Sequence, residues 1–544
     1  MADKRSTNEF GIDAVALNSL NWDLAAKRVL VDIRSDFIYA PHISNVFHHA
    51  ADDLTTAVTT ELKSGRFAPN RPVTIEVPKS SRMQVLPPGS RGPSFSRPGS
   101  ILLPKDRLLY QVLADNAAPL IEQNTDRQRS FSHRLSISNA PEMFESSRAS
   151  WNNLQRTLND LSGAHPKSYV VKADIANCFE MINQHTLINH LDAIGYPSTL
   201  KGALDAFLVL VTGDRNSRGL LQGMFPSDLF GNFYLNPIDE HFRDLNIPSA
   251  RYVDDIYIFV LSLRRAEEVT RLLTAKLRDY DLGLNEYKSK LLRSESLVIE
   301  EPDLERLFDD AFNERLEQLE EDAEIDADYG FQSEWEDDDE EAARESDAEL
   351  HATEVLFDSI DDFPAHVEKI ERFCLPLFAA ATSDYAVQYV LENFGARPAM
   401  TQIYCAYLAK FSENKEITIA LEKALTDDEL LYDWQRMWIF AALMRWKKVS
   451  DEVIRAALRT YTDGVRHEAL RAVAAILAAK HGSFTRQKQL ADSYGHTSST
   501  YLQTAVLYAA RYFQNALRRA SVKSWSAHSQ THAFVAKSIS TLRR

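Results

Sequence analysis

The hydrophobic pattern of the chain changes near its middle. In the first 300 residues, short apolar runs bounded by Pro, Gly and polar residues alternate with amphipathic stretches, which predicts strands mixed with helices. Strands are expected at 70–80, at 168–174 and, as a hairpin, across 250–262. After residue 356 the strand signal ends and helix-length units rich in Ala and Leu follow. The pattern therefore predicts an α+β region followed by an all-α region over 356–544.

Three apolar helical segments of the second half resemble one another: 434–446, 465–482 and 501–513. They recur at a spacing of roughly 30–35 residues, a period typical of stacked helix pairs of the HEAT-like type. Their self-similarity is loose, so a non-repetitive helical bundle stays open as the alternative.

Charge is concentrated in one segment. The net charge is −17, but residues 300–354 contain 25 Asp and Glu against 3 Arg and thus hold −22, leaving +5 for the rest. Such a block is typical of a solvated, disordered linker, which we expect at 300–355. The alternative is an intramolecular mimic of phosphate that covers a basic groove.

Two adjacent carboxylates interrupt the predicted hairpin in RYVDDIYIFV (251–260). Burying Asp254 and Asp255 is unfavourable unless a cation or a metal ion compensates them. An exposed Asp-Asp turn is the simpler explanation for this sequence alone. No apolar run has the length of a membrane span, and the N-terminus has no signal-peptide pattern. The three cysteines form no metal or disulfide spacing, so we expect a reducing, cytoplasmic setting and no membrane.

The companions of this hairpin resemble the palm motifs of reverse transcriptases, in the same order. KADIANCFE (172–180) resembles motif A, GLLQGMFPSDLFGNFYL (219–235) motif B, RYVDD motif C and GLNEYKSK (283–290) motif D. Motif B keeps Ser227 and Asn232 at the usual offsets, although Pro226 precedes the serine instead of following it. RPGSILLPKDRLLYQ (97–111) resembles the fingers motif. The resemblance implies an N-terminal region with fingers over 1–165 and a palm over 166–299.

The resemblance also implies a catalytic centre. Phosphoryl transfer to a 3′-hydroxyl uses two divalent cations, and carboxylates are typical ligands of Mg²⁺. We therefore expect Asp174, Asp254 and Asp255 to hold two Mg²⁺ ions, with Mn²⁺ as a substitute. Asp255 should be the less direct ligand, because successive side chains alternate along a strand. Lys288 of motif D matches a general acid for the leaving pyrophosphate; a solvated helix-end lysine is its alternative.

The remaining matched positions concern the nucleotide. Phe179 matches the aromatic that excludes a ribose 2′-hydroxyl, with plain core packing as the alternative. Gln222 and Gly223 match the loop beneath the incoming nucleotide, where glycine lets the backbone approach closely. Arg97 and Lys79 are candidates for binding the triphosphate.

A palm followed by a helical region resembles the abortive-infection branch of bacterial reverse transcriptases. The resemblance implies anti-phage defence and a homo-oligomer. It also implies synthesis of DNA from dNTPs that can be template-independent and primed from the protein; an RNA template or a non-coding RNA is a further candidate partner. Tyr39, before Ala-Pro in a predicted loop, is the candidate priming residue; a surface tyrosine packed on the following helix is its alternative. Phe179 disfavours an RNA polymerase. The competing hypothesis is a nucleic-acid-binding scaffold with a vestigial palm, whose helical repeats recruit a partner.

Overall fold

The computed structural model describes residues 10–83, 85, 92–136, 140–213, 217–297, 304–327, 337–426, 430 and 432–541. The chain forms two compact units. Unit 1 comprises Met1–Ile75, Pro98–Glu301 and Lys488–Arg544, and unit 2 comprises Glu76–Arg97 and Pro302–Gln487. The predicted combination of an α+β region with a following helical region is confirmed.

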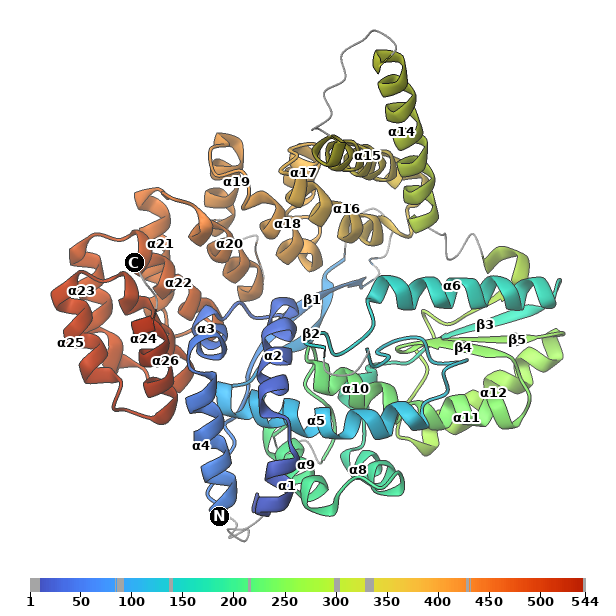
Figure 1. Ribbon diagram of the computed structural model, residues 1–544, viewed down its shortest axis with the longest axis horizontal. Helices are drawn as coiled ribbons and strands as arrows, with labels where there is room; N and C mark the ends of the chain where they lie inside the picture. Colours follow the sequence, from blue (N-terminus) through green and yellow to red (C-terminus); the bar gives the residue numbers. More distant parts are fainter. Residues whose placement is uncertain are drawn as a thin grey trace. The chain divides into compact units, whose positions relative to one another are not determined.

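The centre of unit 1 is a four-stranded antiparallel sheet with the order β4-β5-β3-β6. Its strands are β3 (Tyr169–Asp174), β4 (Ser249–Tyr252), β5 (Asp255–Val260) and β6 (Lys290–Arg293). Figure 1 shows α6 (Ser147–Ala164) on one side of the sheet and α11 (Asn236–Asp244) and α12 (Leu263–Asp279) on the other. Because both of its faces are covered, the interior strand β5 is a continuous apolar run, IYIFV, after Asp255.

The core on the α6 side joins three strands to one helix. Leu154 and Leu158 of α6 pack with Val170 of β3, with Ala250 of β4, and with Tyr257 and Phe259 of β5, all at most 3 % exposed. Two helices lie at the ends of motifs A and B: the short α7 (Cys178–Met181) and the buried α10 (Phe225–Tyr234). This packing fixes the ends of β3 and β5, where the carboxylates of motifs A and C lie.

The other helices of unit 1 surround the long, buried α5 (Pro104–Asn124), which contacts α2, α4, α9 and α10. Pro104 suits the first position of this helix, where no backbone N–H is needed. The surrounding helices are α1 (Ala14–Ser19), α2 (Trp22–Asp32), α3 (Pro41–His49), α4 (Ala51–Lys63), α8 (Gln184–Ala193) and α9 (Ser198–Val211).

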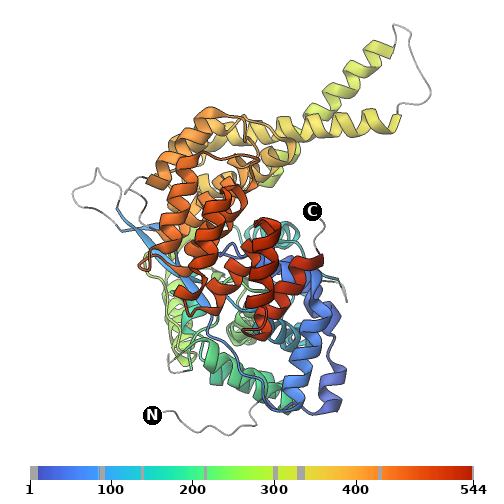
Figure 2. The same ribbon diagram turned by 90° about the vertical axis from the view of Figure 1, so that its left-hand side faces the viewer.

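The last helices of the chain belong to unit 1, which corrects the prediction of one helical domain over 356–544. They are α24 (Thr500–Ala509), α25 (Asn515–Trp525) and α26 (Gln530–Thr541). Helix α26 packs on α3, and Asn45 Nδ2 donates to Ser538 Oγ at 2.8 Å. Figure 2 shows these red helices beside the blue N-terminal ones. These packed helices are far apart in sequence, since Asn45 and Ser538 are separated by 493 residues, and no local sequence pattern predicts their contact.

Unit 2 contains a row of helices in which each helix packs on the helix two positions further along the chain. Helix α16 (Val367–Ala381) packs on α18 (Thr401–Leu408), α18 on α20 (Asp433–Arg445), and α20 on α22 (Glu468–His481). The intervening helices are α17 (Val387–Asn393), α19 (Lys415–Thr426) and α21 (Asp451–Thr462); the following helix, α23 (Phe484–Asp492), includes residues of both units. The segment Glu76–Arg97 adds most of the two-stranded sheet of β1 (Val73–Arg82) and β2 (Ser94–Ile101). The HEAT-like character of this row stays a prediction.

The acidic segment is helical where the structure describes it, so the expectation of a disordered linker at 300–355 is wrong for those residues. Helices α14 (Leu304–Ala327) and α15 (Asp337–Asp358) pack against each other, seen as the yellow-green pair in Figure 2. Arg315 Nε lies 3.0 Å from Asp347 Oδ2. Ala348, Ala352 and Leu356 are buried at a spacing of four residues, a helical stripe within an acidic composition. Residues 328–336 lie outside the described part of the chain.

A search of the described helices for one long and apolar enough to cross a membrane finds none.

Candidate active site

The end of β3 and the turn between β4 and β5 bring two carboxylates together. Asp174 is the last residue of β3, and it lies opposite Asp255 in the antiparallel register of β3 and β5. Asp254 occupies the turn that precedes β5. Burial, and then the negative charge of Asp174, raise the pKa of Asp254 above its ordinary value. The two carboxylates therefore lie close enough to repel each other.

The turn itself has a strained backbone. Val253 has a φ of +54°, a left-handed conformation that β-branched residues rarely adopt. Such a residue costs on the order of 1–3 kcal/mol and persists where its surroundings hold it. Here the Val253 N–H donates to Ser132 Oγ at 2.8 Å, and the Val253 carbonyl accepts from Arg251 Nη1 at 3.0 Å.

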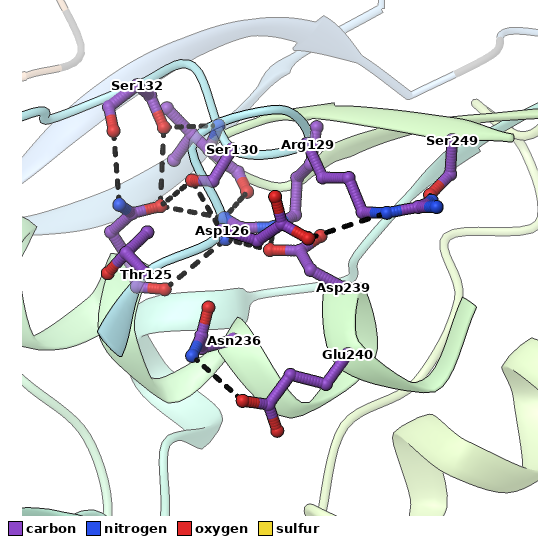
Figure 3. Close-up of polar contacts among 12 residues, drawn as sticks. Thr125, Asp126, Arg129, Ser130, Ser132, Asn236, Asp239, Glu240 and Ser249 are labelled. Carbon is purple, nitrogen blue, oxygen red and sulfur yellow. Dashed lines mark hydrogen bonds and ion pairs between the residues drawn. The ribbon is translucent and has the colours of Figure 1, made fainter. Parts of the chain in front are cut away.

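Arg251, directly before motif C, is the centre of a buried polar network, parts of which are drawn in Figure 3. Its side chain is fully buried and pairs with Asp239 of α11, Nη2 to Oδ2 at 2.6 Å. Its Nη1 donates to Asn232 Oδ1 of α10 at 2.8 Å, and its Nη2 donates to Ser130 Oγ at 3.1 Å. One guanidinium thus joins the motif C turn to α10, to α11 and to the loop that contains Ser130.

The same loop also continues the sheet beside β4. The Arg251 N–H donates to the Arg129 carbonyl at 2.6 Å, and the Phe131 N–H donates to the Arg251 carbonyl at 3.0 Å. Arg129 Nη1 donates to Ser249 Oγ at 2.6 Å. Figure 3 shows Ser130 and Ser132 of this loop within the same group of polar contacts. Motif B identified Asn232 but assigned no role to it, and the sequence did not predict the other members of the network. The available signal was an arginine inside an apolar strand.

Motif D forms hydrogen bonds with the backbone of Asp174 through both its own backbone and a side chain. The Asp174 N–H donates to Ser289 Oγ at 3.3 Å, and the Asp174 carbonyl accepts from the Asn285 N–H at 2.8 Å. This turn places Lys288 Nζ 3.0 Å from Asp174 Oδ1. Partial burial disfavours the charged lysine. The hydrogen bond and charge of Asp174, with the charges of Asp254 and Asp255, outweigh it and raise the pKa of Lys288.

The structure thus brings together Asp174, Asp254 and Lys288. Over the part of the chain that the structure describes, no group of three His, Cys, Asp or Glu is arranged to hold a metal ion. The roles of Asp174, Asp254 and Asp255 as metal ligands stay predictions. The pair of Asp174 and Asp254 does fit Mg²⁺, which proteins commonly hold by one or two carboxylates plus substrate phosphates. A divalent cation would also relieve their mutual repulsion.

Phe179 lies between motif A and motif B. Its ring packs on α10: a Cβ added to Gly231 would lie 2.8 Å from Phe179 Cε1. Its carbonyl accepts from the Leu220 N–H at 2.8 Å, which ties motif A to the loop before α10. The ring is half-buried, as either a nucleotide contact or a packing residue would be.

The loop of motif B borders a cavity within unit 1. Gly223 has a φ of +85°, where a side chain would be strained. Gln222, Glu180 and Arg218 are among the residues that line a cavity of about 250 Å³, with Ser100 of β2 on its wall. The cavity therefore lies beside the loop predicted to contact the nucleotide.

The roles of the remaining predicted residues stay predictions. Lys79 and Arg97 belong to the segment Glu76–Arg97 of unit 2, so the triphosphate clamp stays a prediction. Tyr39 lies, half-buried, between the 3-10 turn Ile33–Ser35 and α3. It lies in a loop, as the sequence predicts, and its role stays a prediction.

Residues 77–319 match the protein family described as reverse transcriptase (RNA-dependent DNA polymerase). The chain therefore contains a reverse transcriptase domain. Among solved structures, it is similar to apo telomerase from Candida tropicalis, with 13% identity and a TM-score of 0.30 over 72% of this chain and 71% of that one. A telomerase from Candida albicans in complex with a fragment of telomeric RNA gives 13% identity and a TM-score of 0.28, over 69% and 70% of the two chains. No curated protein sequence matches the chain.

Proposed function

We propose that this chain is a DNA nucleotidyltransferase, an RNA-directed DNA polymerase by family, that adds dNTPs at the site of Asp174, Asp254 and Lys288. The observation that carries the proposal is the pairing of a carboxylate at the end of β3 with one in the β4–β5 turn, inside a reverse transcriptase domain. Buried carboxylates that repel each other are unfavourable for stability, which is typical of a functional site.

Divalent ions held by the two aspartates would neutralise charge on the nucleotide phosphates and favour ionisation of the attacking hydroxyl. The residues of the chain would position the nucleotide and donate a proton. The Lys288 ammonium, 3.0 Å from Asp174 Oδ1, would donate a proton from Nζ to the leaving pyrophosphate. Phe179 would exclude a ribose 2′-hydroxyl, and Gln222 with Gly223 would support the incoming nucleotide.

The finer parts of the proposal rest on the resemblance to abortive-infection enzymes. They are a role in anti-phage defence, synthesis without a template, assembly as a homo-oligomer, and priming from Tyr39. One contact in unit 1 supports Tyr39: it lies two residues beyond Phe37, whose ring contacts Gly223 of the motif B loop. Tyrosine suits the task, because a phenol with a pKa of about 10 ionises more readily than an aliphatic hydroxyl.

The test is incubation of the purified protein with Mg²⁺ and labelled dNTPs, with and without an RNA or DNA template and primer. We expect incorporation by the unchanged protein and loss of at least 99% of it in Asp254→Asn, with an unchanged melting temperature. Asp244→Asn, which removes an exposed carboxylate from α11, is the matched control and should keep full activity. Retained incorporation in Asp254→Asn would refute the assignment of the site.

The same reaction tests the priming residue. Label that stays with the protein through boiling in detergent, and is lost in Tyr39→Phe, supports priming by this tyrosine. Undiminished labelling of Tyr39→Phe eliminates it. Nucleic-acid binding with no incorporation under any of these conditions would favour the scaffold hypothesis.

A further inference from the structure

The helix of motif B lacks a cap of its own. Helix α10 follows the turn Gln222–Met224, and its N-cap residue, Met224, makes no side-chain hydrogen bond to the first turn. The amide that begins the helix is satisfied from elsewhere in unit 1: the Phe225 N–H donates to Asp32 Oδ2 at 3.0 Å. Asp32 is the last residue of α2. A carboxylate at the N-terminus of a helix also interacts favourably with the positive end of the helix dipole.

Asp32 is held by a buried ion-pair network. Arg107 Nη2 of α5 lies 2.5 Å from Asp32 Oδ2 and 3.0 Å from Asp36 Oδ1, and all three side chains are 1% exposed. Burial raises the pKa of both carboxyls, and the charge of Arg107 opposes this. A buried charge is unfavourable without an opposite charge beside it, so the Asp32 carboxylate is held next to Arg107.

The residue after Asp36 contacts the motif B turn directly. A Cβ added to Gly223 would lie 2.8 Å from Cε2 of Phe37, so the ring occupies the space beside the glycine backbone. The turn is therefore restrained at two points, by Asp32 at Phe225 and by Phe37 at Gly223. Both restraining residues precede residues 77–319, the segment that matches the reverse transcriptase family.

We propose that Asp32 and Phe37 are positioning residues for the nucleotide-binding loop: they hold Gln222–Gly223 in the conformation that receives the incoming nucleotide. The inference rests on the proposed function, in which this loop contacts the dNTP. Asp36 shares Arg107 with Asp32, but the acceptor of the Phe225 N–H is Asp32. Loosening the loop should weaken nucleotide binding and leave the chemical step nearly unchanged, because Asp174, Asp254 and Lys288 lie on other elements.

The experiment compares Asp32→Ala with Asp36→Ala in the full chain. Each variant removes one carboxylate partner of Arg107, so both should lower the melting temperature by similar amounts. Only Asp32→Ala removes the acceptor of the Phe225 N–H, so we expect its KM for dNTP to rise about tenfold, equivalent to about 1.4 kcal/mol. Its kcat should change less than twofold, and Asp36→Ala should keep the KM of the unchanged protein.

Phe37→Leu serves as a second variant, since it keeps an apolar side chain and avoids the loss of a buried charge. It should fold and raise the KM several-fold through the lost contact with Gly223. An equal rise of KM in Asp32→Ala and Asp36→Ala, or an unchanged KM in Phe37→Leu, would overturn the inference. Absence of incorporation by the unchanged protein would instead overturn the proposed function, so the two failures are distinguishable.

Discussion

At the scale of single residues, the contact between Phe179 and Gly231 makes the sugar selectivity testable in two directions. Phe179→Ala should open space for a 2′-hydroxyl and raise the use of rNTP relative to dNTP by about tenfold or more, a difference of about 1.4 kcal/mol. The measurement is the ratio of kcat/KM for the two nucleotides.

Gly231→Ala is the matched variant for this prediction. The new Cβ would lie 2.8 Å from the ring, so the ring must move away from α10. We expect poorer use of dNTP without admission of rNTP. An unchanged rNTP:dNTP ratio in Phe179→Ala would show that Phe179 is only a packing residue.

The buried Asp106 of α5 should make the stability of the protein depend on pH. Its side chain is fully buried, and burial raises its pKa to about 7, although Asn70 donates to both carboxyl oxygens. The folded state therefore favours the protonated carboxyl relative to the unfolded state, where the pKa is about 3.9. The stabilisation from this proton is complete below pH 4 and is lost as the pH rises through about 7.

Asp106→Asn removes this titration. Between pH 5.5 and pH 8, its melting temperature should fall less than that of the unchanged protein, as measured by differential scanning fluorimetry at both values. The absolute stability of the variant is a separate matter, because an amide cannot accept from both Asn70 donors as a carboxylate does. Asp244→Asn is the exposed control. An identical pH dependence in Asp106→Asn would contradict the assignment of a raised pKa to Asp106.

At the scale of elements, the network around Arg251 positions the motif C turn. Arg251→Met should destabilise the protein by about 3–5 kcal/mol, because it leaves Asp239 buried without a partner. Adding Asp239→Leu should restore much of the stability, since an apolar pair can replace a buried ion pair. Incorporation should stay low in the double variant, because the Val253 carbonyl still lacks its donor.

The comparison of melting temperature with activity separates positioning from stability. Full recovery of both in Arg251→Met/Asp239→Leu would show that Arg251 serves stability alone. Recovery of stability without activity is the outcome that the geometry predicts.

The elements also show what the sequence could predict. Asp174 and Asp254 were identifiable because each belongs to a short motif at a strand end, and the antiparallel pairing of β3 with β5 brings the two motifs together. The partners of Arg251 were not identifiable: Asp239 is 12 and Ser130 is 121 residues away, so only the folded chain brings them together. In the acidic segment, composition obscured the buried Ala348 and Ala352, whose spacing of four residues indicated a helix.

At the scale of the whole molecule, the division into units differs from the predicted domains for a related reason. The C-terminal helices have the same composition as those of unit 2, so composition alone assigned them to one domain. Their packing on the N-terminal helices depends on surface complementarity, including the bond between Asn45 and Ser538. Such pairings between distant helices leave no periodic signal in either partner.

The uneven charge distribution should affect the binding of nucleic acid. Residues 300–354 hold a net −22 in a chain whose remainder holds +5, so the acidic helices should repel nucleic acid from any site within their electrostatic reach. That reach is about 8 Å at physiological ionic strength and about 30 Å at 0.01 M. Six exposed acids can be neutralised without removing the buried stripe: Asp309, Asp310, Glu314, Glu317, Glu345 and Glu349.

Replacing these six by Asn or Gln should tighten the binding of single-stranded DNA, measured by fluorescence anisotropy, with the gain largest at low salt and small at 0.5 M. The melting temperature should change little, because exposed substitutions away from buried contacts are nearly neutral. A control in which Asp and Glu are exchanged at the same six positions keeps the charge and should bind as the unchanged protein does. Equal affinity of all three proteins at every salt concentration would show that the acidic helices lie electrostatically apart from the nucleic-acid site.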